Sequence, residues 1–361
     1  MGPMVNESYL ETFKGKRVLV TGHTGFKGSW LALILKSLGA EVMGYALAPA
    51  YRGGHFELLD LERTISHVVG DVRDLNSLSD AVRRFEPEIV FHLAAQAIVR
   101  ESYADPKSTF DINVGGSVNL LEAVRTCDSV RALVYITSDK CYENVEWIWA
   151  YRENDALGGR DPYSASKAAA EIVFSSYLRS YFAERPQFGA GSARAGNVIG
   201  GGDWAVDRIV PDCVRALLSS QPIVLRNPSA TRPWQHVLEP LAGYLTLAQG
   251  LLLDGERHAQ AWNFGPDASS VASVETVVRT LAQRWPSSAK WRVDAAEHPH
   301  EASLLALDSS KARQLLGWQP RWTLHEALEQ TLDWHLAWQG GQDMYRFTRE
   351  QIANYQGEMN D

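Results

Sequence analysis

The sequence predicts an α/β protein with a doubly wound parallel sheet and a smaller, mixed α/β domain toward the C-terminus. Three observations predict this class. Short apolar strands alternate with helices through about residue 195, and such alternation calls for a parallel sheet covered on both faces. The first strand ends in a glycine-rich turn. Beyond Gly196 the pattern becomes irregular, with a glycine triplet at 200–202, several prolines and many tryptophans.

The individual elements follow from periodicity and from the positions of glycine and proline. Strands are expected at 16–21, 42–46, 67–71, 89–93 and 132–137. Helices are expected at 29–38, 81–85, 110–127, 163–181, 209–218, 274–284 and 309–316. We expect residues 1–193 to form a dinucleotide-binding domain, with returning segments near 230–265. Residues 194–229 and 266–361 are expected to form a substrate domain.

Bulk composition narrows the class of partner. The net charge is −8 and the chain has no long basic run, which argues against nucleic acid or an anionic membrane as partner. Its three cysteines have no tight spacing, so they predict neither a disulfide framework nor a zinc site, and a cytoplasmic location fits them. No signal peptide is expected at the N-terminus, and no apolar run approaches the roughly 20 residues that span a bilayer.

The turn after the first strand has the spacing G-x-x-G-x-x-G. Gly22 permits the tight turn, Gly25 lets the backbone approach a pyrophosphate, and Gly28 lets helix and strand pack closely. The following helix offers free N–H groups and a partial positive charge to phosphates. A plain strand–helix turn is the alternative, but the position at the first such junction favours a Rossmann-type dinucleotide site.

The adenine-ribose end of that site is less regular. In an NAD site a carboxylate about 20 residues further on meets the ribose hydroxyls. The second strand here ends Tyr45-Ala46-Leu47 without an acid, and Arg52 lies nearby, so this strand alone does not separate NAD from NADP. Asp71, at the end of the third strand, suits either the adenine edge or the N-cap of the next helix.

A Tyr-x-x-x-Lys pair carries the predicted redox chemistry. Tyr163 and Lys167 are spaced i and i+4, on one face of a helix. A protonated lysine stabilises a phenolate and so lowers the pKa of the tyrosine, which can then take a proton from a substrate hydroxyl. The pair is weak evidence alone. It gains weight from the glycine trio and from Thr137-Ser138 at the end of a predicted core strand.

These motifs together resemble the extended short-chain dehydrogenase/reductase family over nearly the whole chain. The likeness includes Leu93-Ala94-Ala95-Gln96, Asn113-Val114-Gly115-Gly116 and Leu316-Gly317-Trp318-Gln319-Pro320. It implies NAD as cofactor and a catalytic trio of Ser138, Tyr163 and Lys167. The implied cofactor-binding residues are Gly22, Thr24, Gly25, Phe26, Lys27, Gly28, Asp71, Val72, Leu93, Ala94, Ala95, Gln96, Asn113, Thr137, Tyr163 and Lys167.

The residues after Ser138 indicate which subgroup of this family the chain resembles. Nucleotide-sugar 4-epimerases usually carry small residues there, and most 4,6-dehydratases carry Asp-Glu. This chain has Asp139-Lys140, and with the glycine-rich turn and Trp234-Gln235-His236-Val237 it resembles the dehydratase subgroup that takes CDP-glucose. The implied reaction is a lyase step from CDP-glucose to CDP-4-dehydro-6-deoxyglucose and water. It would begin the route to CDP-linked deoxyhexoses such as those of lipopolysaccharide O-antigens.

The resemblance also implies roles for the catalytic groups. Tyr163 would take the C4 hydroxyl proton while hydride passes from C4 to NAD. The resulting 4-ketone makes the C5 proton acidic. Lys140, as a neutral amine, would remove that proton, and Asp139, as a protonated carboxyl, would protonate the departing C6 hydroxyl. The alternative is that Asp139 and Lys140 form a surface ion pair in a turn.

The smaller domain should hold the nucleotide end of the substrate. The expected substrate-binding residues are Gln96, Asn197, Arg208, Arg232 and Glu301. The planar fork of arginine binds phosphate oxygens in pairs, although each arginine could instead be a solvated surface residue. His298, His300 and Glu301 form a loose cluster whose spacing is poor for a metal, and no metal site is expected.

Two other functions stay open at this point. One is a nucleotide-sugar 4-epimerase, or a dehydratase for another nucleotide sugar. The other is a non-catalytic protein that senses a dinucleotide on the same fold, although such a sensor has no need of the proton-transfer residues. The family resemblance further implies a homodimer or a higher homo-oligomer, joined through the helices near 106–126 and 163–183.

Overall fold

The computed structural model describes residues 9–286, 290–294 and 304–357, and its centre is a seven-stranded parallel sheet. The strand order is β11-β6-β5-β4-β1-β2-β3, so the chain reverses direction across the sheet after β3. This confirms the doubly wound Rossmann-type class. The strands are β1 (Arg17–Thr21), β2 (Glu41–Ala46), β3 (Ser66–Val69), β4 (Ile89–His92), β5 (Ala132–Ile136), β6 (Gly189–Arg194) and β11 (Ala261–Asn263).

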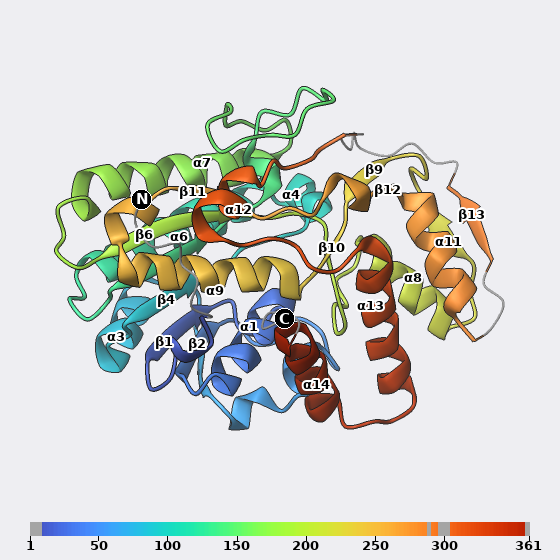
Figure 1. Cartoon of the computed structure of the whole chain (residues 1–361), viewed down its shortest axis with the longest axis horizontal. Coiled ribbons are helices and arrows are strands. Elements are labelled where there is room, and N and C mark those ends of the chain that lie inside the picture. Colours follow the sequence, from blue (N-terminus) through green and yellow to red (C-terminus); the bar gives the residue numbers. More distant parts are fainter. Residues whose placement is uncertain (1–8, 287–289, 295–303, 358–361) are drawn as a thin grey trace.

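Helices cover both faces of the sheet, as the alternating sequence requires (Figure 1). One face packs against α1 (Phe26–Ser37) and α9 (Leu238–Leu253), and the other against α3 (Leu75–Phe85), α6 (Gly116–Arg125) and α7 (Pro162–Tyr177). β1, β4 and β5 are buried throughout or nearly so, which explains their continuous apolar runs.

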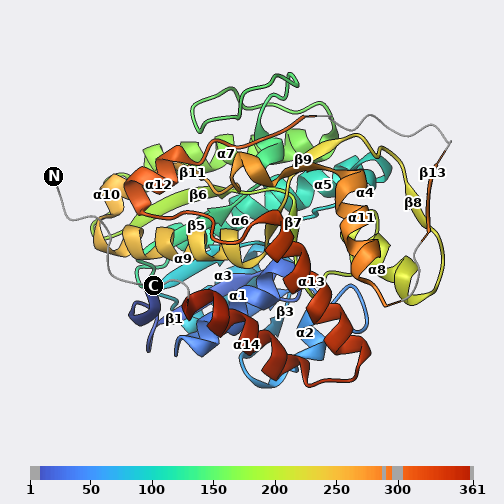
Figure 2. The same cartoon turned by 45° about the vertical axis from the view of Figure 1, so that its right-hand side comes forward.

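A smaller lobe lies at the side of the sheet where the parallel strands end (Figures 1 and 2). Its apolar core joins α8 and α11 to the first turns of α13. Three two-stranded ribbons belong to this region. The helices are α8 (Ile209–Leu218) and α11 (Val274–Arg284), and the strand pairs are β7 (Val198–Ile199) with β10 (Gln235–His236), β9 (Thr231–Pro233) with β12 (Val271–Ser273), and β8 (Ile223–Leu225) with β13 (Trp291–Val293).

The C-terminal helices return to the Rossmann core. They are α12 (Ser310–Leu316), α13 (Leu324–Gln339) and α14 (Met344–Gly357), of which only α12 was expected. Thr323 begins α13 with a capping box that involves Glu326. Buried Glu239, in the first turn of α9, accepts hydrogen bonds from the backbone N–H groups of Arg321 and Trp322 and from the Tyr355 hydroxyl. This carboxyl therefore ties α13 and α14 to α9.

Two expected helices are interrupted. The helix expected at 110–127 is α5 (Pro106–Phe110), a π-helical turn (Asp111–Gly115) and α6, and it begins earlier because Asp105 caps it and Pro106 occupies its first position. The helix expected at 163–181 is α7 followed by a π-helical turn (Leu178–Phe182). The remaining short helices are α2 (His55–Leu58), α4 (Val99–Ala104) and α10 (Gly255–His258). Among the described residues, none of the helices is long and apolar enough to cross a membrane.

Candidate active site

A cavity of about 1000 Å³ opens where the carboxyl ends of the central strands face the smaller lobe. Ligands of open α/β sheets bind at this edge. The cavity is lined by every sequence-predicted site residue except Asn113 and Glu301. Glu301, together with His298 and His300, lies outside the described residues. The predicted site residues, which come from eight separate stretches of the chain, therefore line one cavity.

The glycine-rich turn has the close packing that a dinucleotide site needs. Gly22 has a φ of +75°, which favours glycine, and a Cβ on Gly28 would lie 2.1 Å from the Gly22 carbonyl oxygen. Gly25 is the N-cap of α1 and makes no side-chain capping hydrogen bond, and the first residues of this helix line the cavity. Lys27 follows in the first turn, and burial lowers its pKa to about 8.

The C-terminal end of β2, where a carboxylate would meet the adenine ribose, carries no acid, as the sequence indicated. Leu47 is 55% exposed, and its carbonyl accepts a hydrogen bond from the Thr24 hydroxyl. Asp71 lines the cavity and binds the Arg73 side chain with both carboxylate oxygens, which holds the pKa of Asp71 below its usual value. The alternative that Asp71 caps the next helix is wrong, because Asp74 caps α3.

The Tyr-x-x-x-Lys pair lies on the first turns of α7. Asp161 caps this helix, and Pro162 occupies its first position, so that Tyr163 and Lys167 come to lie on its cavity-facing side. The Lys167 amine lies 6.0 Å from the centre of the Tyr163 ring. The side chain of Ser138, which follows β5, forms a hydrogen bond with Tyr163.

The expected lowering of the Tyr163 pKa by Lys167 is wrong for the protein alone. Burial raises the pKa of Tyr163 to about 12, and the hydrogen bond with Ser138 offsets only part of that increase. Burial also lowers the pKa of Lys167 to about 8, because a buried ammonium loses its hydration. Burial is therefore the largest cause of the pKa shift of both side chains.

Asp139 and Lys140 begin a short 3-10 turn directly after Ser138. Asp139 is 2% exposed, and its carboxylate accepts a hydrogen bond of 2.9 Å from the Ser138 hydroxyl and one of 3.3 Å from the Asn197 amide. Lys140 is half-buried and also lines the cavity. Within the described part of the chain no ion pair joins Asp139 to Lys140, so a surface ion pair is not what fixes this turn.

A buried polar network lies behind the turn. Glu171, one helical turn beyond Lys167, pairs with Arg194 at 2.7 Å and accepts hydrogen bonds from Thr137 and Ser192. Arg194 also donates to the hydroxyl of Tyr142, the residue that follows the 3-10 turn. This network connects α7, β5 and β6 behind the catalytic side chains.

Asn113 does not line the cavity, but it forms hydrogen bonds with Gln96, which does. Its side-chain oxygen accepts from the Gln96 amide, and its side-chain nitrogen donates to the Gln96 carbonyl and to the Ser166 hydroxyl. It therefore joins the loop after β4 to α7. Gln96 itself is fixed by a hydrogen bond to Thr109.

Two of the expected substrate arginines line the smaller-lobe side of the cavity. Arg208 pairs with Asp203 at 3.0 Å, and the Asp203 charge raises the pKa of Arg208. Arg232 is 8% exposed and donates to the Thr231 carbonyl. Sequence reasoning missed Asp203 and three further arginines that line the cavity, because they follow no motif and reach it only through the fold: Arg100, Arg160 and Arg226.

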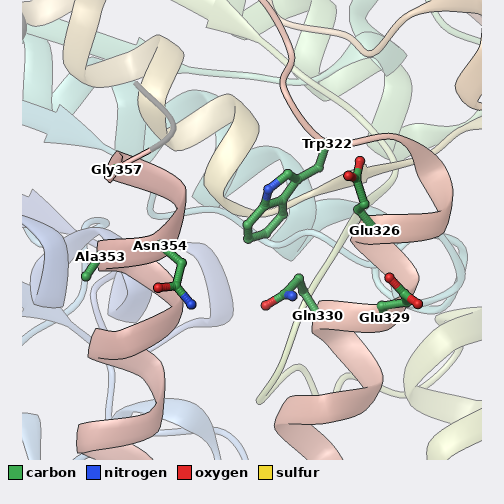
Figure 3. A pocket seen from close by; sticks show the side chains of 7 residues that line it. All are labelled: Trp322, Glu326, Glu329, Gln330, Ala353, Asn354 and Gly357. Atoms are coloured by element: carbon green, nitrogen blue, oxygen red, sulfur yellow. The ribbon is translucent and has the colours of Figure 1, made fainter. Parts of the chain in front are cut away.

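A second, smaller pocket lies between α13 and α14 (Figure 3). Trp322, Gln330 and Asn354 are among its lining residues, and none of the predicted site residues reaches it. Figure 3 shows Glu326 and Glu329 on α13 at its edge. Over the described residues, no group of three or more His, Cys, Asp or Glu side chains is arranged to hold a metal ion.

The fold and this site define an enzyme of the extended short-chain dehydrogenase/reductase type. Residues 19–331 match the family model described as GDP-mannose 4,6 dehydratase, and the chain belongs to that family.

Among curated proteins, the chain is 49% identical to a CDP-glucose 4,6-dehydratase of Salmonella typhimurium, over 95% of this chain and 97% of the relative. It is 27% identical to a dTDP-glucose 4,6-dehydratase of Xanthomonas campestris, over 88% and 92% of the two chains. Among solved structures, it superposes with a TM-score of 0.74 on a UDP-glucose 4-epimerase of Thermus thermophilus in complex with NAD. That match has 28% identity and covers 88% of this chain and 98% of the other.

Proposed function

We propose that the protein converts CDP-glucose to CDP-4-dehydro-6-deoxyglucose and water, with NAD as cofactor. The observation that carries the proposal is the meeting of Ser138, Asp139, Lys140, Tyr163 and Lys167 on one cavity. An epimerase has no need of an acid and a base directly after the serine. The 49% identity to a CDP-glucose 4,6-dehydratase over 95% of the chain supports both the reaction and the nucleotide.

The residues divide the reaction into four proton movements. Tyr163 takes the C4 hydroxyl proton, with Ser138 bonded to its phenol. Lys140 takes the C5 proton, which the new ketone has made acidic, and gives a proton back to C5 when hydride reaches C6. Asp139 gives a proton to the departing C6 oxygen. Bound NAD⁺ would accept hydride from C4 and return it to C6, and its positive ring would favour the phenolate of Tyr163 despite burial.

The nucleotide and the cofactor would occupy different parts of the cavity. The uncapped amides of α1 suit the cofactor diphosphate. Arg208 and Arg232, on the smaller-lobe side, suit the diphosphate of the sugar nucleotide. The cavity wall next to β2 carries Leu47, Ala48 and Tyr51, and Arg52 does not line it, which supports NAD rather than a cofactor with a 2′-phosphate.

One incubation tests the reaction and the nucleotide together. The purified chain would be mixed with NAD⁺ and, separately, with CDP-, dTDP- and GDP-linked hexoses, and the products weighed by mass spectrometry. We expect loss of one water with CDP-glucose and slower loss with the others. Recovery of a product of unchanged mass but inverted C4 would identify an epimerase, and loss of water from another nucleotide alone would refute the CDP assignment.

We also propose that two copies join through the long helices, α5–α6 on one side and α7 on the other. Exposed apolar side chains on and around these helices support this, among them Ile172 at 58% and Tyr181 at 55% exposure. Sedimentation at micromolar concentration should give at least a dimer, and a monomer would contradict the proposal.

The protein's cysteines support a cytoplasmic location. All three are buried and have free thiols.

A further inference from the structure

Gly196 lies directly against the Asp139 carboxyl. It is the second residue after β6, and β6 pairs with β5, the strand that leads to Ser138. A Cβ built on Gly196 would lie 2.0 Å from Oδ2 of Asp139 and 2.3 Å from Oδ1. Carbon and oxygen atoms never approach so closely, so the carboxyl lies in the space that a side chain on Gly196 would fill.

The backbone at this point is held in place from behind. The side-chain amide of Gln235, which is 2% exposed, donates to the Gly196 carbonyl at 3.2 Å and to the Phe264 carbonyl at 2.9 Å. The backbone N–H of Gln235 donates to the Asn197 carbonyl at 3.3 Å. Gly196 therefore cannot move away easily from Asp139, because β10 and the end of β11 fix it.

Asn197, the next residue, also contacts the Asp139 carboxyl. Its backbone has a φ of +51°, in the left-handed region, and its side-chain amide donates to Oδ2 of Asp139. A donor at Oδ2, with Ser138 bound to Oδ1, fixes the plane of the carboxyl. The pair Gly196-Asn197 thus supplies both the space and an orienting hydrogen bond.

We infer that Gly196 and Asn197 are positioning residues for Asp139 and act on the loss of water rather than on the first hydride transfer. The inference rests on the proposed role of Asp139 as the proton donor to the C6 oxygen. A shift of about 1 Å in a catalytic group can cost on the order of 10²-fold in rate. Gly196 and Asn197 have no proposed part in the transfer of the C4 proton, which Tyr163 takes.

The test is the single substitution Gly196→Ala, compared with Asp139→Asn and with Gly357→Ala. The last is the control, because a Cβ on Gly357 meets nothing within 4 Å. With CDP-glucose and NAD⁺ we expect Gly196→Ala to form the nicotinamide absorbance band in a single turnover at nearly the parent rate. Steady-state 4-keto-6-deoxy product should fall by about 10²-fold. Solvent deuterium should still enter C5, since Lys140 is unchanged.

A second variant removes the hydrogen bond and keeps the backbone. Asn197→Gly tolerates the left-handed φ, so its loss of product formation should be smaller, about 10-fold. The melting temperature is measured for all variants.

The outcomes separate the inference from the role on which it rests. If Asp139→Asn stalls after the first hydride transfer and Gly196→Ala does not, the inference is wrong. If Asp139→Asn does not stall, the proposed role of Asp139 is wrong instead. If Gly196→Ala loses the absorbance band as well as the product, the methyl group disturbs more than Asp139, and the inference is again wrong.

Discussion

The Arg194 guanidinium lies 2.7 Å from the Glu171 carboxylate, and both side chains are almost completely buried behind the strand end that carries Ser138. An ion pair in this position fixes three elements at once, because Glu171 also holds Thr137 and Ser192, and Arg194 also holds Tyr142. The pair is too far inside the protein to touch a substrate. It joins α7 to β6 next to the turn that carries Ser138 and Asp139.

Breaking this pair on one side should destabilise the fold strongly. Arg194→Met leaves the Glu171 carboxylate buried and uncompensated, which typically costs about 3–5 kcal/mol of unfolding free energy. The double variant Arg194→Met with Glu171→Leu should recover a large part of that loss, because no buried charge remains. Urea unfolding measures both. If the losses of unfolding free energy from the two substitutions simply add in the double variant, the two charges are not coupled.

Loss of the Tyr163 hydroxyl should remove turnover without removing cofactor binding. Tyr163→Phe keeps the ring, which is 8% exposed and packs in the cavity wall. We expect a fall in kcat on the order of 10²-fold or more, as for loss of a general base, and a nearly unchanged Kd for NAD⁺ by calorimetry. Turnover close to that of the parent protein would refute the role of Tyr163.

The dehydration step should separate from the first hydride transfer. Asp139→Asn cannot give a proton to the C6 oxygen, and Lys140→Ala has no base for C5. Both variants should form the nicotinamide absorbance band in one turnover, while product formation falls by roughly 10²–10⁴-fold. Deuterium from solvent should enter C5 in Asp139→Asn but much more slowly in Lys140→Ala. Unchanged product formation in both would make these residues structural.

NAD⁺ should be held less firmly here than in relatives with an acid on the second strand. A carboxylate contributes about 1.5–3 kcal/mol for each hydrogen bond to a ribose hydroxyl. We therefore expect activity to rise with added NAD⁺, and Leu47→Asp to lower the Kd by about 10-fold or more. Leu315→Asp is the control, because Leu315 is exposed on α12, away from the cavity. Protein that purifies with full, non-exchanging NAD⁺ would contradict this expectation.

The parts of the fold that the sequence predicted are those with a repeating signal. The first five strands of the sheet and the helices α8 and α11 alternate or recur with clear periods, and the structure confirms them, whereas the bounds of β6 and β11 were not predicted. Helix α9 was missed because it is buried on almost every side, so that LEPLAGYLTLAQGLLL has no polar face to mark it. Helices α13 and α14 were missed as well, although a capping box begins α13.

The residues of the candidate site also fall into those that a sequence motif identified and those that only the fold brings together. Motifs identified the residues at strand ends and on the first turn of a helix, such as Ser138 and Tyr163. Glu171 and Arg194 are 23 residues apart on different elements, and nothing in the sequence pairs them. The contact of Gly196 with Asp139 depends on the register of β5 with β6, which the sequence does not specify. The prediction that Lys167 lowers the pKa of Tyr163 was wrong, because the extent of burial at Tyr163 cannot be estimated from the sequence.

Buried histidines should make the fold sensitive to acid. Burial lowers the pKa of five histidines to about 3: His23, His55, His92, His236 and His335. A group whose pKa is lower in the folded state than its unfolded value of about 6.5 stays neutral in the fold but binds a proton on unfolding. Stability from these groups is therefore complete above about pH 6.5 and falls as the pH drops toward 3.

His335 offers the cleanest single test of that dependence. It is 1% exposed, neither ring nitrogen has a hydrogen-bond partner among the described residues, and it packs edge to face against Trp204 and Trp334. His335→Phe keeps an aromatic ring there and removes one proton uptake. Between pH 4 and 6 the slope of unfolding free energy against pH should decrease by up to about 1.4 kcal/mol per pH unit.

The matched control is His325→Gln, since the His325 side chain is 64% exposed on the same helix. Urea unfolding at half-unit intervals from pH 4 to 8 gives both slopes. As the pH approaches 8, the difference in unfolding free energy between His335→Phe and the parent protein should stop changing with pH, because His335 is then neutral in both the folded and the unfolded state. An equal change of slope in the two variants, or none in His335→Phe, would mean that the buried ring already takes up its proton in the folded protein.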